Sequence, residues 1–77
     1  MQMEVLTNKL RECRAEYHIR QADLARELDI PRETIGRLER GEYQNPGYKM
    51  VYRIAAYFNR SVEDVFRYEE ERHPEGS

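Results

Sequence analysis

Four residues of the segment PRETIGRLE have types and spacing that suit the recognition of nucleic-acid bases. The helical period places them opposite Ile35 and Leu38, which we expect to face a core. The four are Arg32, Glu33, Gly36 and Arg37. Arginine donates two parallel hydrogen bonds to guanine, glutamate accepts one from cytosine, and glycine lets a helix approach base edges closely. The pattern predicts a helix face that contacts bases in a major groove.

The elements that must position this face are two short helices joined by a tight turn, within the 19 residues 21–39. Apolar residues recur at helical spacing before Asp29 and again after Pro31. Ala25 is small where the helices must cross closely. Asp29 lies at the turn, and aspartate enters the left-handed backbone region more readily than most residues. An exposed charged face is by itself more often only solvated, so the prediction depends on the whole helix-turn-helix arrangement.

Several separated blocks of the chain resemble one family of regulators, in the right order from about Leu10 to Phe66. The blocks are LRECRAEY, QADLARELDIPRETIGRLERG, Asn45-Pro46 and RIAAYFNRSVEDVF. They resemble the XRE or Cro/repressor-type helix-turn-helix regulators, and above all the short members that consist of the DNA-binding domain. Many relatives carry Ser or Thr where this chain has Pro31, Gln where it has Glu33, and a polar residue where it has Gly36. These departures concern the base preference rather than the fold.

The resemblance implies an all-α fold, the five-helix lambda-repressor-like DNA-binding domain. It also implies a homodimer on a palindromic operator, with the helix at 31–39 in the major groove. Gln21 would contact the DNA backbone, as the residue at this point does in the family. Other basic and polar residues around the motif are placed to contact phosphates too. The expected backbone contacts are Arg20, Gln21, Thr34, Arg40, Tyr43, Asn45 and Lys49.

Cap residues predict where three helices begin. Thr7 is expected to cap a first helix that runs to about His18. Its inward stripe would be Leu6, Leu10, Cys13 and Tyr17. Asn45-Pro46 is typical of a helix start, whose free N–H groups favour a phosphate. Ser61 is followed three residues later by an acidic residue, which resembles a capping box and predicts a short last helix.

The two ends of the domain leave alternatives open. The alternation in residues 1–5 suits a short strand, and an unordered start is the alternative. Such a strand would pair with residues 65–69 in a two-stranded sheet; otherwise Phe66 and Tyr68 close the core. We expect the domain to cover residues 1–68, with residues 69–77 as an acidic disordered tail.

A dimer contact is expected near the end of the domain. In the family, the last helical segment commonly forms this contact. Here the apolar residues of that segment are Val62, Val65, Phe66 and Tyr68. We therefore expect these side chains to form the homodimer interface.

The composition describes one small and polar domain, with 77 residues of which 36% are charged. Residues 1–60 carry eleven basic and nine acidic residues, net +2, whereas residues 61–77 carry two and six, net −4. The overall charge of −2 therefore hides a basic first part, and local fields matter more than the sum for binding DNA. No apolar run approaches the roughly 20 residues that span a bilayer. We expect a cytoplasmic protein that does not contact membranes.

Catalytic and metal-binding chemistry is not indicated. The chain shows no nucleophile-base set and no phosphate-binding glycine loop. Its one cysteine, Cys13, is off the helical face of His18 and is expected in the core. We therefore expect no enzyme activity, no cofactor and no metal.

These patterns together favour a sequence-specific transcription regulator, in particular a repressor, whose partners are an operator in double-stranded DNA and a second copy of the chain. Two other classes remain as alternatives. One is the antitoxin of a toxin-antitoxin pair, in which the acidic tail would serve to neutralise a protein. The other is a protein-interaction module that keeps the fold without binding DNA, as the negative net charge would suit.

Overall fold

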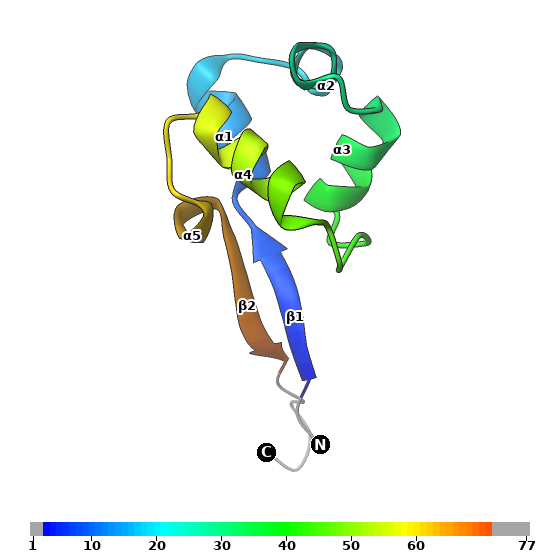
Figure 1. Ribbon diagram of the computed structural model, residues 1–77, viewed down its shortest axis with the longest axis vertical. Helices are drawn as coiled ribbons and strands as arrows, with labels where there is room; N and C mark the ends of the chain where they lie inside the picture. The colour runs from blue at the N-terminus through cyan, green and yellow to red at the C-terminus, as the bar shows by residue number, and fades with distance from the viewer. Residues whose placement is uncertain (1–2, 72–77) are drawn as a thin grey trace.

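The computed structural model describes residues 3–71, which form five helices and a two-stranded antiparallel ribbon (Figure 1). The elements in chain order are β1 (Met3–Asn8), α1 (Leu10–Tyr17), α2 (Gln21–Leu28), α3 (Arg32–Glu39), α4 (Tyr48–Tyr57), α5 (Val62–Val65) and β2 (Phe66–Glu71). The predicted five-helix fold with a terminal two-stranded sheet is confirmed. Within residues 3–71, none of the helices has the length and apolar character that crossing a membrane requires.

A left-handed residue ends α2 and turns the chain towards α3. Asp29 has a φ of 56°, and its N–H donates to the carbonyl of Arg26. The N–H of Ile30 donates to the carbonyl of Ala25, which closes the last turn of the helix. Pro31 then precedes α3 as its N-cap. The predicted turn at Asp29 is confirmed.

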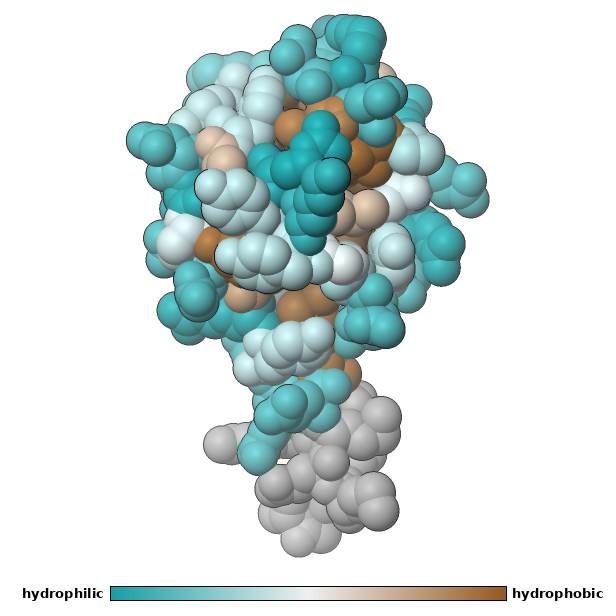
Figure 2. All heavy atoms as spheres, viewed as in Figure 1, coloured by the Kyte–Doolittle hydropathy of each residue, from teal (hydrophilic) through white to brown (hydrophobic). Residues whose placement is uncertain are grey.

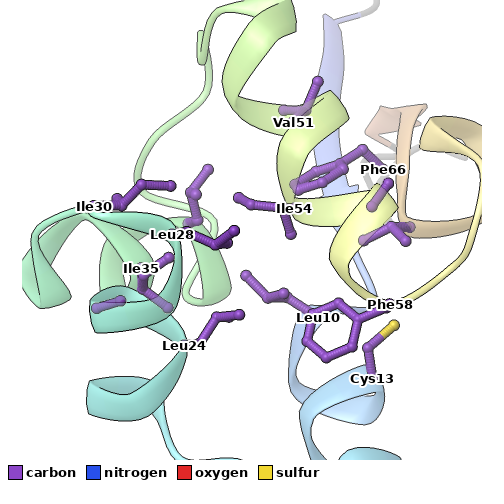
Figure 3. Packing of buried hydrophobic residues seen from close by; sticks show 14 of the residues in the cluster. Leu10, Cys13, Leu24, Leu28, Ile30, Ile35, Val51, Ile54, Phe58 and Phe66 are labelled. Carbon is purple, nitrogen blue, oxygen red and sulfur yellow. The ribbon is translucent and has the colours of Figure 1, made fainter.

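One apolar core holds the helices and the ribbon together. Its largest fully buried side chains are Leu10, Cys13, Leu24, Ile35, Leu38, Ile54, Phe58 and Val65. Figure 3 shows residues of the helix-turn-helix, such as Leu24 and Leu28, pointing towards Leu10 and Ile54 of α1 and α4. Burial of each Leu, Ile or Phe contributes about 1.5–3 kcal/mol, so this core determines how α2 and α3 sit on the rest of the domain. On the outside of the domain, hydrophilic residues cover most of the visible face (Figure 2).

The ribbon is shifted along the chain from its predicted position. β1 and β2 pair antiparallel, with Leu6 opposite Tyr68. The predicted pairing of residues 1–5 with 65–69 is correct in kind but places the first strand too early. Leu6 is a buried residue of β1. Because it lies four residues before the buried Leu10, the sequence pattern wrongly assigned it to the first helix.

The predicted tail also begins too early. Residues 69–71 belong to β2, because each of them pairs with a residue of β1. Three consecutive glutamates have low strand propensity, so the sequence favoured disorder there, and pairing with β1 overrides that propensity. Residues 1–2 of the predicted strand and 72–77 of the predicted tail lie outside the described residues.

The side chain of Asn8, not that of Thr7, bonds to the start of the first helix, whose N-cap is Lys9. Thr7 lies in β1, where its hydroxyl donates across the ribbon to the carbonyl of Arg67 at 3.3 Å. The Asn8 Oδ1 accepts from the N–H of Leu10 at 3.0 Å, and its Nδ2 donates to the carbonyl of Leu38 at 2.7 Å. One side chain therefore satisfies both the start of α1 and the end of α3. The cap prediction for Thr7 was wrong because the strand continues past it.

The loop before α4 also departs from prediction, since the helix begins at Tyr48 with Gly47 as its N-cap. The predicted start at Asn45-Pro46 is too early because the loop is held to other parts of the chain. The Gln44 amide bonds to the backbone of Leu6 and to the carbonyl of Gly41.

The cap of α5 follows the prediction. The Ser61 Oγ accepts from the N–H of Asp64 at 3.1 Å, so the predicted cap is confirmed.

We expect Asn8→Ala to lower the free energy of unfolding by about 1–2 kcal/mol, because it removes the acceptor of the Leu10 N–H and leaves the Leu38 carbonyl with its backbone bond from Gly41 alone. Thr7→Ala is the matched control next to it, and its loss should stay within about 0.5 kcal/mol. Urea unfolding followed by circular dichroism measures both. Equal losses in the two variants would contradict the role given to Asn8.

Candidate nucleic-acid interface

The third helix has one inward and one outward face, as the pattern predicts. Ile35 and Leu38 are buried, at 0% and 1% exposure. Arg32, Glu33 and Arg37 are exposed on the other side. The structure therefore brings these three predicted base-contacting residues together on one solvent-facing side of α3, from its first turn to its last.

Gly36 lies elsewhere than predicted, because it is buried rather than exposed. A Cβ at this position would lie 3.1 Å from the Arg40 Nη1 and 3.7 Å from the Gln21 Oε1. The first residue of α2 thus packs over the backbone of α3 at Gly36. The contact with Gln21 is an ordinary van der Waals distance, and the closer one is with the end of the flexible Arg40 side chain. The predicted exposure of Gly36 is therefore wrong, because these two side chains cover it.

A buried ionic network connects α1, α2 and α3 beside this crossing. Arg14 binds both carboxylate oxygens of Glu39, whose side chain is only 1% exposed. The Gln21 Nε2 donates to the same carboxylate at 3.0 Å, and the Arg14 Nη1 donates to the carbonyl of Ile19. The Glu39 carboxylate therefore has three donors, which offset the cost of burying its charge. Gln21, expected to contact the DNA backbone, is held in place by this network.

Sequence reasoning missed Arg14 and Glu39, although a signal existed. Arg14 follows the buried Leu10 by four residues, and Glu39 follows the buried Ile35 by four. Helical spacing therefore put both charges on inward stripes, one on each helix. Two opposite charges on facing apolar stripes indicate a buried pair, but only the packing of α1 against α3 shows that they meet.

The Arg37 side chain is held by an aromatic ring. Its guanidinium carbon lies 5.6 Å from the centre of the half-buried Tyr43 ring, within the range of a cation–π interaction. The backbone of the loop supports this contact, since the N–H groups of Glu42 and Tyr43 both donate to the Arg37 carbonyl. Tyr43 was predicted to contact the DNA backbone, and in the structure its ring also lies beside Arg37, a predicted base-contacting residue.

Most of the remaining predicted phosphate contacts are exposed. Arg40 is exposed and its guanidinium binds both carboxylate oxygens of Glu42, at 2.9 and 3.1 Å. That hydrogen bond raises the pKa of Arg40 and lowers the pKa of Glu42 from their ordinary values. Exposed ion pairs contribute little stability, so Arg40 is free to exchange Glu42 for a phosphate. Arg20, Asn45 and Lys49 are exposed, and Thr34 is half-buried.

Three of the four predicted dimer residues line one groove, and the fourth is buried. Val65 and Phe66 are buried in the core, with exposures of 1% and 5%. Val65 is therefore not available to a second subunit, and that part of the prediction is corrected, whereas Phe66 still lines a groove at the surface. They are apolar because they close the domain. Val62 is half-buried, and Tyr68 is 61% exposed. Both line a shallow groove of about 330 Å³ together with Leu6, Pro46, Tyr48, Val51, Glu63 and Phe66.

Similar proteins are found both by sequence and by structure. The family model described as Helix-turn-helix matches residues 10–65. An uncharacterized HTH-type transcriptional regulator of Archaeoglobus fulgidus is 41% identical over 66 residues, or 86% of this chain and 92% of that protein. For YgzD of Bacillus subtilis, also an uncharacterized HTH-type transcriptional regulator, the identity is 33% over 86% of this chain and 98% of the relative. A crystal structure from Bacteroides fragilis has the same fold, with a TM-score of 0.71 and 21% identity over 82% of this chain and all (100%) of that chain.

We expect Arg14→Met to lower the free energy of unfolding by about 3 kcal/mol, because it leaves the Glu39 carboxylate buried without its main partner. The double variant Arg14→Met/Glu39→Leu should lose clearly less than the sum of the two single variants. Arg11→Met, an exposed position on the same helix, is the control and should change little. Additive losses in this double-mutant cycle would contradict the coupling.

Proposed function

Because this chain belongs to the XRE-type helix-turn-helix family of DNA-binding transcriptional regulators, we propose that it is a repressor that binds a palindromic operator as a homodimer. One observation carries the proposal. α3 presents Arg32, Glu33 and Arg37 to solvent while its opposite face is buried against the domain. A helix held in this way presents its exposed side chains to a major groove in one orientation. Occupancy of an operator that overlaps a promoter is sufficient for repression.

The exposed side chains of α3 have complementary tasks in this proposal. Arg32 and Arg37 donate to guanine O6 and N7, the commonest specific contact in the major groove. Glu33 accepts from the amino group of cytosine, and elsewhere on DNA its charge would be repelled by phosphates. The Tyr43 ring restricts Arg37 before binding, so less side-chain entropy is lost when the arginine meets its base. Gly36 takes no part in base contact.

Phosphates are bound at the margins of the same surface. The start of α2 offers backbone N–H groups without a side-chain cap, beside the Gln21 amide that Glu39 holds. Arg40 leaves Glu42 for a phosphate, and Lys49 adds a charge from the first turn of α4. The full set that we propose for the backbone is Arg20, Gln21, Thr34, Arg40, Tyr43, Asn45 and Lys49.

The distribution of charge supports this orientation on DNA. Residues 1–60 carry a net charge of +2 and residues 61–77 a net charge of −4. The acidic end of β2 lies at the end of the ribbon remote from α2 and α3 (Figure 1). A negative pole away from DNA and a basic surface towards it favour approach in one orientation.

A homodimer is part of the proposal because a single α3 can contact only a few base pairs. Each α3 presents only a few side chains to the bases, and two copies related by a two-fold axis double the contacts. A palindromic operator has the matching symmetry, with half-sites about one helical turn apart or a multiple of it.

Selection of bound sites from random duplex DNA tests the proposal. We expect one enriched palindromic motif, whose affinity falls with salt with a log-log slope of about −0.9 for each neutralised phosphate. A promoter that carries the motif should lose transcription when the protein is expressed. Recovery of random sequence at moderate salt would contradict specific binding.

Variants of the Arg37–Tyr43 pair test the reading surface. Arg37→Ala should cost about 1–3 kcal/mol at one guanine of each half-site and relax the preference there. Tyr43→Leu removes the ring and should relax the same position in part, whereas Tyr43→Phe keeps the ring and should retain the parent preference. Unchanged base frequencies in Arg37→Ala would show that Arg37 is not a reader. A loss in Tyr43→Phe as large as in Tyr43→Leu would show that the hydroxyl, not the ring, is what matters.

A further inference from the structure

We propose that two copies of the chain pair through the outer edges of their β2 strands, antiparallel and about a two-fold axis at Tyr68. The result is a sheet of the order β1-β2-β2-β1, in which the second copy continues the ribbon of the first. The inference rests on the homodimer of the proposed function and states how it forms. It moves the interface from the buried Val65 and Phe66 to an exposed strand edge.

The two edges of the ribbon differ, because β1 is covered at Leu6 and β2 is open. The edge of β1 is covered at Leu6, whose N–H donates to the Gln44 Oε1 at 2.7 Å and whose carbonyl accepts from the Gln44 Nε2 at 3.1 Å. The amide of Gln44 thus acts as a short piece of neighbouring strand. Within residues 3–71 the sheet has two strands, so β2 has no neighbour on its other side.

The bonds of Gln44 also show which groups of β2 point outward. Directly opposite residues of an antiparallel pair turn their backbone groups either both towards each other or both away. Leu6 turns away to Gln44, so its partner Tyr68 turns away as well. The neighbouring Arg67 should then face β1, and its carbonyl does accept from the Thr7 hydroxyl.

The outward groups of β2 match those of a second β2. By the same alternation, Glu70 points outward with Tyr68. The Phe66 carbonyl does too, while its N–H is used by the Val62 carbonyl at the end of α5. In the proposed pairing, the two Tyr68 residues exchange N–H and carbonyl bonds, and each Glu70 N–H donates to the Phe66 carbonyl of the other copy. An open strand edge is otherwise a site of uncontrolled association.

Charge selects the register of this pairing. A two-fold axis at Tyr68 places Arg67 of each copy opposite Glu69 of the other, so both cross-strand pairs attract. An axis at Arg67 or at Glu69 would place like charges opposite each other, and an axis at Glu70 would oppose glutamates at the axis and beside it. Phe66 cannot serve as the axis, because the residues before it belong to α5. Tyr68 is thus the one centre in β2 that avoids repulsion.

The exposed aromatic residues near β2 also favour a second copy of the chain as the partner. Tyr68 is 61% exposed and lies on the face of β2 that also carries the buried Phe66. Tyr68 lines the apolar groove with Tyr48, which is 70% exposed. A second Tyr68 directly across the axis would stack beside the first and shelter the open side of this groove. Two large exposed rings at one groove are typical of a surface that a partner covers.

Cysteine cross-linking tests the register. Tyr68→Cys places two thiols directly opposite each other, with Cα atoms about 5.5 Å apart, which suits a disulfide. Glu70→Cys is the matched control on the same edge, where the two copies of residue 70 would be roughly 13 Å apart, too far for a disulfide. We expect mild oxidation to convert Tyr68→Cys into covalent dimers and to leave Glu70→Cys and the parent protein, whose Cys13 is buried, without them.

Charge reversal tests the same pairing without oxidation. Arg67→Glu and Glu69→Arg should each raise the dimer dissociation constant roughly tenfold or more, because each variant places like charges opposite in both pairs. The combination of the two restores the attraction and should return the dissociation constant to near the parent value. Sedimentation equilibrium measures this, and thermal unfolding of each variant shows whether the subunit remains folded.

The outcomes separate this inference from the proposed function. A parent protein that is a dimer, but in which Tyr68→Cys fails to cross-link or the double charge reversal fails to restore affinity, overturns the β2 pairing and leaves the homodimer standing. A parent protein that is monomeric with and without operator overturns both. Dimers in Glu70→Cys as abundant as in Tyr68→Cys would show random collision and would also overturn the register.

Discussion

The contact between Arg14 and Glu39 is the interaction on which the rest of the structure depends. Glu39 is buried at the end of α3, and its carboxylate receives donors from α1 and from the start of α2. Any arrangement that separates these helices leaves a buried charge without a partner, which costs several kcal/mol in a domain whose total stability is of the order of 5–15 kcal/mol. Apolar side chains alone would tolerate small shifts of α3. The ionic network does not.

The same network positions the surface that we propose for DNA. It holds the Gln21 side chain at the start of α2 against α3 at Gly36. The outward residues of α3 are therefore carried by a helix that is fixed at its crossing with α2 and at its end. Tyr43 extends this rigidity to the Arg37 side chain. Binding to DNA then requires little ordering of the protein, so more of the contact energy appears as affinity and specificity.

The ribbon forms the end of the domain that lies away from α2 and α3. It joins the two ends of the described chain, and Asn8 and Gln44 attach it to α3 and to the loop that follows. Its acidic strand lies away from α2 and α3, so the surface that we propose for DNA and the edge that we propose for a second copy are separate. The two surfaces share no residue, which lets each be altered without direct damage to the other.

Interactions between residues close in sequence were determined by the sequence itself. The turn at Asp29 and the cap at Ser61 each involve only neighbouring residues, and the inward faces of the helices follow from the helical period, so these features could be predicted. Contacts between distant residues were decided by the tertiary structure alone. Gln44 lies 38 residues from Leu6, and Arg14 lies 25 from Glu39. Whether Leu6 belonged to a helix or a strand, and whether Gly36 faced DNA or α2, depended on what packed against them, because an apolar or small residue fits several local patterns and only its neighbours in space select one.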